Sequence, residues 1–212
     1  MLTRVKIKNL RSIREQEVAV APLTVLYGPN GSGKSTFLHS LAILRNVALN
    51  PNQPLDSFFN LFFANFGGFE QVVFNHVPDE QIELEIDSMR DSAIINYKVV
   101  LGKNKGGFSI QVREPFKVAS TIETTFPYPG HIHQNITIEN KGVPVTVDWN
   151  GILAQPLGAP ETPEAAKKAQ ELAILLNGPI EELHKTDFIH IKRGFSNPHY
   201  GVVSLTPTLY TE

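Results

Sequence analysis

The chain has 212 residues, of which 42% are hydrophobic and 19% charged, and its formal net charge is -2. This composition is typical of a folded globular protein, and the near-neutral charge excludes a uniformly basic surface for nucleic acid. The absence of cysteine excludes disulfides and thiolate zinc sites. No apolar run reaches the roughly 18 residues of a membrane helix, and the N-terminus lacks the apolar stretch of a signal peptide. We therefore expect a cytoplasmic protein without a membrane partner.

The N-terminal elements are expected to be strands followed by a helix. Alternation around Val5 and Ile7 predicts a half-buried strand, and a second short strand is expected around residues 17–20. Residues 23–27 form a short apolar run with β-branched side chains, which predicts a buried strand. Residues 35–47 have the spacing of an amphipathic helix, with prolines following it.

Residues 57–66 contain five phenylalanines whose spacing gives one apolar stripe on a helix, namely Phe58, Phe59, Phe62, Phe63 and Phe66. One interpretation is packing in the core, which we favour because aromatic side chains mostly serve cores. The other is a docking face for a partner segment.

The second half of the chain is expected to begin with an antiparallel β-rich lobe. Candidate strands are separated by Gly, Asn, Lys and Pro, and they cover residues 82–86, 93–101, 108–112, 132–139 and 143–149. A helix is predicted from Pro163 to about residue 176, with Thr162 as its N-cap and an Asn-Gly-Pro stop after it. A last strand is expected at 187–192. This gives a core over residues 1–80, a β-rich lobe or insertion over 81–150, and a helix plus strand returning to the core over 151–212.

Residues 28–35 read Gly-Pro-Asn-Gly-Ser-Gly-Lys-Ser and fit the phosphate-binding pattern G-x-x-x-x-G-K-[ST] throughout. The glycines let backbone N–H groups converge on a phosphate, and the following helix directs its N-terminal N–H groups at the same anion. Lys34 is expected to reach the β- and γ-phosphates, and the Ser35 hydroxyl to ligate Mg²⁺. The expected strand before the loop and helix after it are the required context. The sequence therefore predicts a site for ATP and Mg²⁺.

The residues around this loop resemble a known group of proteins. Lys8-Asn9-Leu10-Arg11-Ser12 precedes the loop, which continues into Thr36. This arrangement resembles the N-terminal part of ABC-type ATPases of the SMC, RecF and OLD families, which are P-loop ATPases of the AAA type. The resemblance implies an α/β P-loop NTPase fold, an ABC-ATPase-like head with a mixed sheet and an antiparallel lobe. It also implies that Arg11 contacts a phosphate and that Ser12 lies beside it. The expected nucleotide-binding set is then Arg11, Ser12, Asn30, Gly31, Ser32, Gly33, Lys34, Ser35 and Thr36.

The same resemblance implies a glutamine loop after the lysine, whose side chain meets Mg²⁺ and the attacking water. Gln71 is the candidate, with Glu70 second. The implied catalytic residues are Lys34 and Gln71, and the implied metal ligands are Ser35 and Gln71. An exposed loop glutamine without such a role is the alternative.

Two elements that these families use for hydrolysis are not found in the sequence. One is an apolar strand ending in Asp-Glu (Walker B), and Asp87 and Asp148 are followed by Ser88 and Trp149 instead. The other is an S-G-G signature segment. We therefore expect the chain to lack the C-terminal half of the pattern and to hydrolyse ATP weakly or not at all by itself. Its own C-terminal half, or a partner chain, would supply Walker B. By resemblance, ATP-bound heads form a homodimer, and DNA is a candidate partner.

Histidines offer two further hypotheses. His131 and His133 share one face of an expected strand and could ligate a metal, although the sequence places no third ligand. Residues 187–193, together with Pro198 and Tyr200, are similar to a stretch of OLD-like ATPases. There His190 and His199 flank Arg193, either as a contact for phosphate or nucleic acid or as an ordinary polar surface.

Three functions remain open from the sequence. The first is an ATP-driven dimerising head in DNA repair, recombination or phage defence. The second is a nucleotide-binding regulator that does not hydrolyse ATP. The third is a small-molecule phosphotransferase, which would explain Lys34 and Ser35 but not Arg11 or the β-rich lobe.

Overall fold

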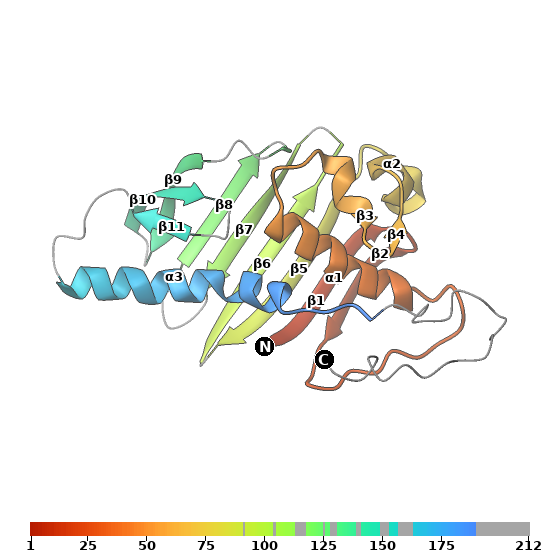
Figure 1. The fold of residues 1–212 in the computed structure, drawn as a ribbon, viewed down its shortest axis with the longest axis horizontal. Coiled ribbons are helices and arrows are strands. Elements are labelled where there is room, and N and C mark those ends of the chain that lie inside the picture. The colour runs from red at the N-terminus through yellow and green to blue at the C-terminus, as the bar shows by residue number, and fades with distance from the viewer. Residues whose placement is uncertain are drawn as a thin grey trace, which may run out of the picture.

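The computed structural model describes residues 1–90, 92–103, 105–112, 118–124, 126–127, 131–138, 141–148, 153–156 and 163–189. In this part of the chain, nine strands form one antiparallel sheet in the order β11-β10-β9-β8-β7-β6-β5-β1-β2 (Figure 1). The strands are β1 (Leu2–Leu10), β2 (Ile13–Ala19), β5 (Ile82–Arg90), β6 (Ala93–Leu101), β7 (Gly106–Val112), β8 (Val118–Thr124), β9 (His131–Ile138), β10 (Lys141–Asp148) and β11 (Leu153–Pro156).

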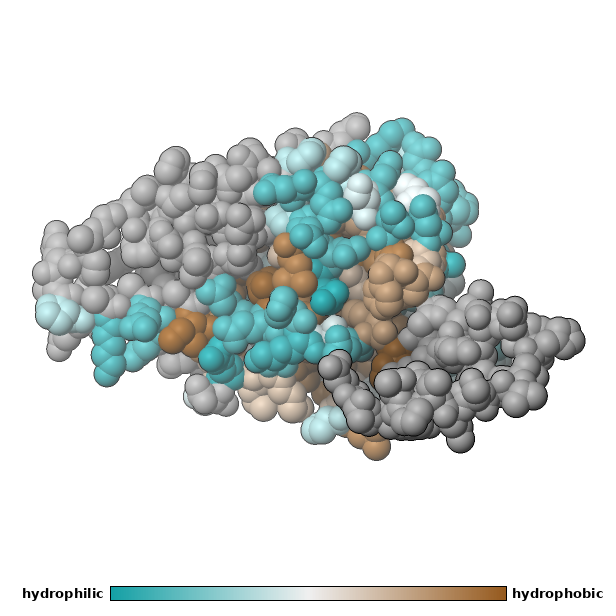
Figure 2. Space-filling model, viewed as in Figure 1, coloured by the Kyte–Doolittle hydropathy of each residue, from teal (hydrophilic) through white to brown (hydrophobic). Residues whose placement is uncertain are grey.

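Two long helices, α1 (Lys34–Leu49) and α3 (Pro163–His184), lie on the same face of this sheet (Figure 1). Short elements connect α1 to β5 and gather beside α1. They are η1 (Leu55–Phe59), the hairpin of β3 (Asn60–Leu61) and β4 (Ala64–Asn65), α2 (Phe69–Val72) and η2 (Phe74–His76). On the face shown in Figure 2, hydrophilic residues cover most of the described surface. No helix in the described ranges is long and apolar enough to cross a membrane.

Alternation along the central strands separates an apolar face from a charged face. Ile82, Leu84 and Ile86 of β5 are at most 1% exposed. The other face carries ion pairs across neighbouring strands. Arg4 of β1 donates from Nε to Asp87 of β5 at 2.7 Å and also pairs with Glu85 and Glu17. Because side chains alternate with period two, this pattern fixes which face the helices cover.

The core lies between the apolar face of the sheet and the two long helices. α1 contributes the buried side chains Phe37, Ile43, Leu44 and Val47, and α3 contributes Leu175, Leu176, Ile180 and Leu183. Each fully buried leucine or isoleucine stabilises the fold by about 1.5–3 kcal/mol relative to its exposed state. The packing of α1 matters for the site because the phosphate-loop sequence leads directly into this helix.

The structure confirms the α/β class and the antiparallel sheet. The predicted strands at 82–86, 93–101 and 108–112 correspond to β5, β6 and β7, and those at 132–139 and 143–149 correspond to β9 and β10. β8 and β11 were not predicted. In the described part the sheet is antiparallel throughout rather than mixed. It also includes strands from both sides of the predicted boundary at residue 80, because β5 pairs with β1. The three-part division of the chain stays a prediction.

The prediction of a buried strand at residues 23–27 is wrong. These residues form no strand, and Leu23, Val25 and Tyr27 are 82%, 72% and 90% exposed. None of the backbone–backbone hydrogen bonds described for the chain involves residues 23–27. An apolar run becomes a buried strand only when a neighbouring strand pairs with its backbone and another layer covers its side chains. Among the described residues, no strand pairs with this segment, and only Leu26 packs partly against the core.

Residues 57–66 do not form the helix on which their phenylalanines would make one stripe. The chain makes a 3₁₀ turn over 55–59 and then the β3–β4 hairpin. Phe58 and Phe59 are fully buried, which agrees with the core interpretation, while Phe62 at the hairpin turn is 74% exposed. The i, i+4 stripe does not exist because the turn between β3 and β4 sends these side chains in different directions.

The predicted end of the last helix near residue 176 is wrong as well, because α3 continues through Pro179 to His184. A proline inside a helix costs about 3 kcal/mol. Ile180 and Leu183, at 6% and 0% exposed, lie beyond it and pack into the core, which offsets that cost. Residues 187–189 of the predicted last strand are not in a strand. Residues 190–192 lie outside the described residues.

Candidate nucleotide-binding site

The loop between residue 27 and α1 has a backbone conformation with positive φ angles at its glycines. Gly28, Gly31 and Gly33 have φ angles of 145°, 82° and 89°, values that other residues rarely adopt. A Cβ at Gly33 would lie 3.3 Å from Ile13 Cγ1, so the loop also packs closely against β2. Gly33 is the N-cap of α1, and as a glycine it has no side chain to cap this helix. Uncapped N–H groups at a helix N-terminus favour an anion there.

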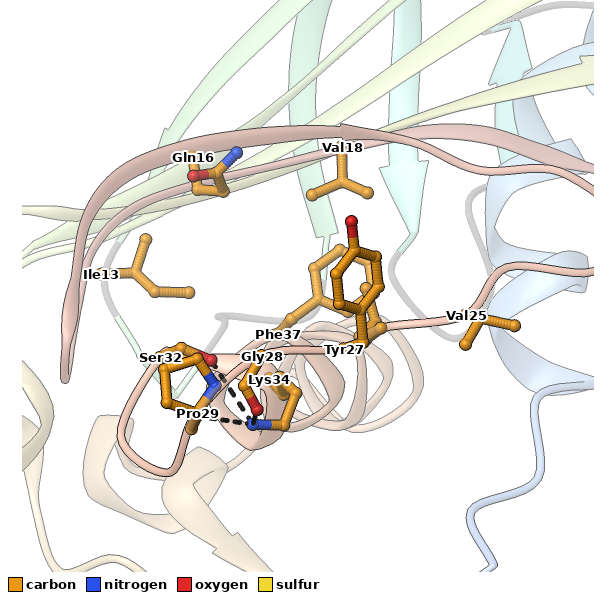
Figure 3. Close-up of a pocket in the computed structure, with 12 residues that line it drawn as sticks. Ile13, Gln16, Val18, Val25, Tyr27, Gly28, Pro29, Ser32, Lys34 and Phe37 are labelled. Carbon is orange, nitrogen blue, oxygen red and sulfur yellow. Dashed lines mark hydrogen bonds between the residues drawn. The ribbon is translucent and has the colours of Figure 1, made fainter.

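Lys34 is turned into the loop. Its Nζ donates hydrogen bonds to the carbonyl oxygens of Gly28 at 2.8 Å and Pro29 at 2.7 Å, and to Ser32 Oγ at 3.4 Å (Figure 3). The ammonium group of Lys34 therefore contacts three oxygens of the loop itself.

A cavity of about 760 Å³ gathers three segments that are far apart in the sequence. The β1–β2 turn, the phosphate-loop sequence with the start of α1, and α2 with the residues after it all line the cavity. Its lining residues are Arg11, Ser12, Asn30, Gly31, Ser32, Gly33, Lys34, Ser35, Thr36, Gln71, Val73, Asn75 and His76. All residues expected from the sequence to surround the nucleotide thus lie around one space. Their role in binding stays a prediction.

The β1–β2 turn is tied to both neighbouring segments. Arg11 has a positive φ of 52°, and its amide N donates to the Val72 carbonyl at 2.6 Å. Ser12 Oγ lies 3.2 Å from Thr36 Oγ1 on the first turn of α1, within hydrogen-bond distance. The turn is therefore held between α1 and α2, which places Arg11 and Ser12 at the rim of the phosphate loop.

A fixed turn also positions Gln71. Its Oε1 accepts a hydrogen bond from the Gly68 amide at 2.8 Å, and the Phe69 amide donates to Asp56 at 2.7 Å. A Cβ at Gly68 would lie only 2.7 Å from the Asp56 carboxyl group, so this position accommodates glycine alone without displacement. Glu70, the second candidate, does not line the cavity. It pairs with Lys103 at 2.6 Å, which lowers the pKa of Glu70.

Sequence reasoning did not single out Asn75 and His76. Both have positive φ angles, 52° and 57°, and both line the cavity. His76 Nδ1 lies 2.9 Å from the Glu70 carbonyl oxygen. The only sequence signal was their position shortly after the candidate glutamine, because the strained turn that brings them to the cavity is not visible in a periodicity pattern.

A second, more apolar cavity of about 400 Å³ lies on the other side of the loop sequence. Ile13 and Val18 of β2, Phe37 of α1, and Val25 and Tyr27 before the loop line it, and Figure 3 shows the Tyr27 side chain pointing toward Val18. Residues 25–27 therefore line an apolar cavity, although Val25 and Tyr27 are largely exposed.

The chemistry of the first cavity fits an anion with a hard cation. Arg11 and Lys34 are its cationic side chains, and no carboxylate stands among the described residues that line it. Hydroxyl and amide oxygens are supplied by Ser12, Ser35 and Gln71, and Mg²⁺ prefers oxygen ligands. The residues present thus fit a phosphate group accompanied by Mg²⁺.

The histidine hypotheses receive no support. His131 and His133 lie in β9 two positions apart, which places them on one face of the strand, but their side chains are outside the description. Among the residues that the structure describes, no group of three or more His, Asp or Glu could hold a metal ion. The hypotheses for this part of the chain concern residues outside the described ones, namely His190, Arg193, Pro198, His199 and Tyr200.

Comparison with known proteins agrees with the class of protein that the loop and cavity define. The family model described as AAA ATPase domain matches residues 1–99. A 44-residue stretch is 39% identical to the OLD nuclease of Thermus scotoductus (strain ATCC 700910 / SA-01), which corresponds to 21% of this chain and 8% of that protein. The chain therefore spans only a small part of this relative. The two findings support an AAA-type ATPase part at the N-terminus that is similar to a stretch of an OLD nuclease.

Proposed function

We propose that the chain binds ATP with Mg²⁺ at residues 28–36 and acts as the N-terminal, nucleotide-binding part of an OLD- and SMC-like ATPase. The observation that carries this proposal is the cavity of about 760 Å³. It gathers Arg11, Ser12, the glycine-rich loop and Gln71 without any carboxylate among the described lining residues. The match to the AAA ATPase domain and the similarity to an OLD nuclease support it.

Different residues of the chain would bind the phosphates and Mg²⁺. The loop amides and the N-terminus of α1 would surround a phosphate group, since the N-cap residue Gly33 has no side chain to cap this helix. Lys34 would exchange its contacts with the Gly28 and Pro29 carbonyls for phosphate oxygens. Arg11 would add a second cation from the β1–β2 turn. Ser35 and Gln71 would hold Mg²⁺, which, when bound, neutralises charge on the β- and γ-phosphates.

The wider role follows from the same proposal. We infer that the head dimerises on binding ATP and serves DNA repair, recombination or phage defence in the cytoplasm, with DNA as a candidate partner. The exposed apolar residues Leu23, Val25 and Tyr27 support a further strand packed beside the loop. The chain's own C-terminal half, or a partner chain, would supply this strand, and it would carry the Asp-Glu pair for hydrolysis.

Removal of the loop lysine tests the proposal. Lys34→Ala should abolish ATP binding or weaken it strongly, because the phosphate loses its charged partner. Isothermal titration of ATP with Mg²⁺ into the wild-type and variant chains measures the difference. Lys167→Ala, at an exposed position of α3, is the matched control and should bind as the wild type does. Equal affinities for wild type and Lys34→Ala would contradict the proposed site.

A further inference from the structure

Two aromatic side chains that play no part in the proposal above hold Arg11. The guanidinium carbon of Arg11 lies 4.4 Å from the centroid of the Phe66 ring. Its Nη1 lies 3.5 Å from Nδ1 of His39. The His39 ring packs in turn against Phe66, with centroids 4.7 Å apart, and against Phe63 at 5.7 Å. The cation of Arg11 therefore rests on one ring and beside another.

These contacts come from the elements that form the rest of the site. His39 follows Ser35 by four residues on α1, so both lie on the same side of that helix. Phe66 follows β4 and directly precedes the Gly67–Gly68 turn that fixes Gln71. Figure 1 shows the β3–β4 hairpin beside α1, in agreement with these contacts. Arg11 is therefore in contact with the helix that begins at the phosphate loop and with the segment that leads to the glutamine.

The chemistry of each contact suits a permanent cation. An arginine over an aromatic face gains electrostatic attraction from the ring. A histidine nitrogen can accept a hydrogen bond from arginine only when the imidazole is neutral. Burial and the charge of Arg11 lower the pKa of His39, which favours that neutral form. The face of Phe66 and the neutral form of His39 can therefore each interact favourably with the positive charge of Arg11.

We propose that His39 and Phe66 are positioning residues, which hold the Arg11 guanidinium ready to contact the nucleotide phosphates at the rim of the cavity. This inference rests on the proposed function. A long arginine side chain loses conformational freedom when it binds a phosphate, and prior ordering by neighbours reduces that loss. The turn that carries Arg11 is also fixed through its backbone, because the Arg11 amide donates to Val72. Backbone and side chain are thus both restrained before a ligand arrives.

The contact itself can be tested without nucleotide. An NMR titration of the His39 ring should show a pKa below the ordinary value in the wild-type chain. Arg11→Gln should raise that pKa, because the neighbouring charge is removed. The His39→Asn variant identifies the resonance by its loss. An unchanged His39 pKa in Arg11→Gln would show that the two side chains do not interact, and it would overturn the proposal.

Binding of a fluorescent ATP analogue tests the role in the site. His39→Leu and Phe66→Leu should each weaken binding by roughly two- to fivefold, the factor that corresponds to an exposed cation–π contact. His39→Asn keeps an acceptor near the position of Nδ1 and should retain more affinity than His39→Leu. Phe62→Leu, on the exposed turn of the same hairpin, and His184→Asn, at the exposed end of α3, are matched controls and should bind as the wild type does.

Double variants separate positioning from simple packing. If His39 and Phe66 act through Arg11, neither His39→Leu nor Phe66→Leu should weaken binding further in an Arg11→Gln background. Equal losses with and without Arg11 would assign both rings to packing alone and overturn the proposal. Binding by the wild type with no change in the His39 and Phe66 variants would overturn only the positioning role. A wild-type chain that binds no analogue would overturn the proposed function and, with it, the phosphate role of Arg11.

Discussion

Strand β5 and segment 23–27 both carry apolar side chains that predict a strand, yet these side chains have opposite environments. Ile82, Leu84 and Ile86 of β5 are at most 1% exposed, whereas Leu23 and Tyr27 are 82% and 90% exposed. β5 pairs with β1 on one side and β6 on the other, and α3 packs over it. Segment 23–27 takes part in none of the described backbone–backbone hydrogen bonds. The comparison teaches that an apolar β pattern is not sufficient for a buried strand. The fold must also place a pairing strand beside it and a second layer over its side chains.

The largest expected effect concerns the covered side of this comparison. Leu84→Ala should lower the free energy of unfolding by about 2–5 kcal/mol, because it leaves a cavity in a fully packed region. Val25→Ala, at a 72% exposed position, should change it by at most about 0.5 kcal/mol. Urea unfolding followed by circular dichroism measures both values. Similar losses for the two variants would mean that segment 23–27 is covered in solution, and the comparison would break down.

A somewhat smaller effect is expected at the turn that fixes Gln71. Gly68→Ala should destabilise the chain by about 1–3 kcal/mol, since its Cβ would lie 2.7 Å from the Asp56 carboxyl group. Adding Asp56→Ala removes the opposing group, so Gly68→Ala should cost less in that background. Urea unfolding of the four proteins gives the coupling between the two positions. Strictly additive losses would show that the close approach of these residues does not limit the turn.

The exposed apolar side chains of segment 23–27 predict self-association of the chain. Replacing Leu23, Val25 and Tyr27 with threonine should reduce the association of the chain at high concentration, because apolar surface beside the loop is removed. Phe62→Thr, which removes another exposed ring, serves as the matched comparison. Light scattering over a concentration series measures the change. Equal scattering from the wild type and the triple variant at every concentration would show that segment 23–27 does not drive association.

The smallest expected effect is a pH dependence from the charged face of the sheet. Burial opposes ionisation of Glu83, but hydrogen bonds and charges from Lys98 and Lys8 outweigh it and lower the pKa of Glu83. The folded state therefore holds this carboxylate ionised more strongly than the unfolded state does. Its contribution to stability is present above the ordinary glutamate pKa and is lost as the pH falls through the lowered value.

Glu83→Gln should therefore flatten the loss of stability on the acid side of pH 4.5, the ordinary value for this group. Unfolding curves from pH 3 to pH 7 (roughly the range over which glutamates titrate) test the difference. Glu171→Gln, at an exposed position of α3, is a suitable control for the loss of one surface carboxylate. An identical pH profile in wild type and Glu83→Gln would show that the pairs with Lys8 and Lys98 add nothing measurable.

The sequence by itself determined the local features of this protein. The glycine, lysine and serine pattern predicted the loop, since it encodes positive φ angles and the start of a helix within eight residues. Alternation predicted β5, β6 and β7 because strand burial has period two. The α1 helix followed from its spacing of apolar side chains. All of these depend on interactions between near neighbours in the chain.

The tertiary structure decided what depends on distant partners. It placed Arg11 and Gln71 around one cavity through the contacts of the β1–β2 turn with α1 and α2. It continued α3 through Pro179, because burial of Leu183 offsets the cost of a proline inside a helix. The sequence pattern shows the proline but not this burial. Among the described residues, it also left segment 23–27 without a paired strand, although the composition of this segment predicts one. The physical reason is the same in each case: burial and backbone pairing depend on surfaces supplied from elsewhere in the chain, and a local pattern does not specify them.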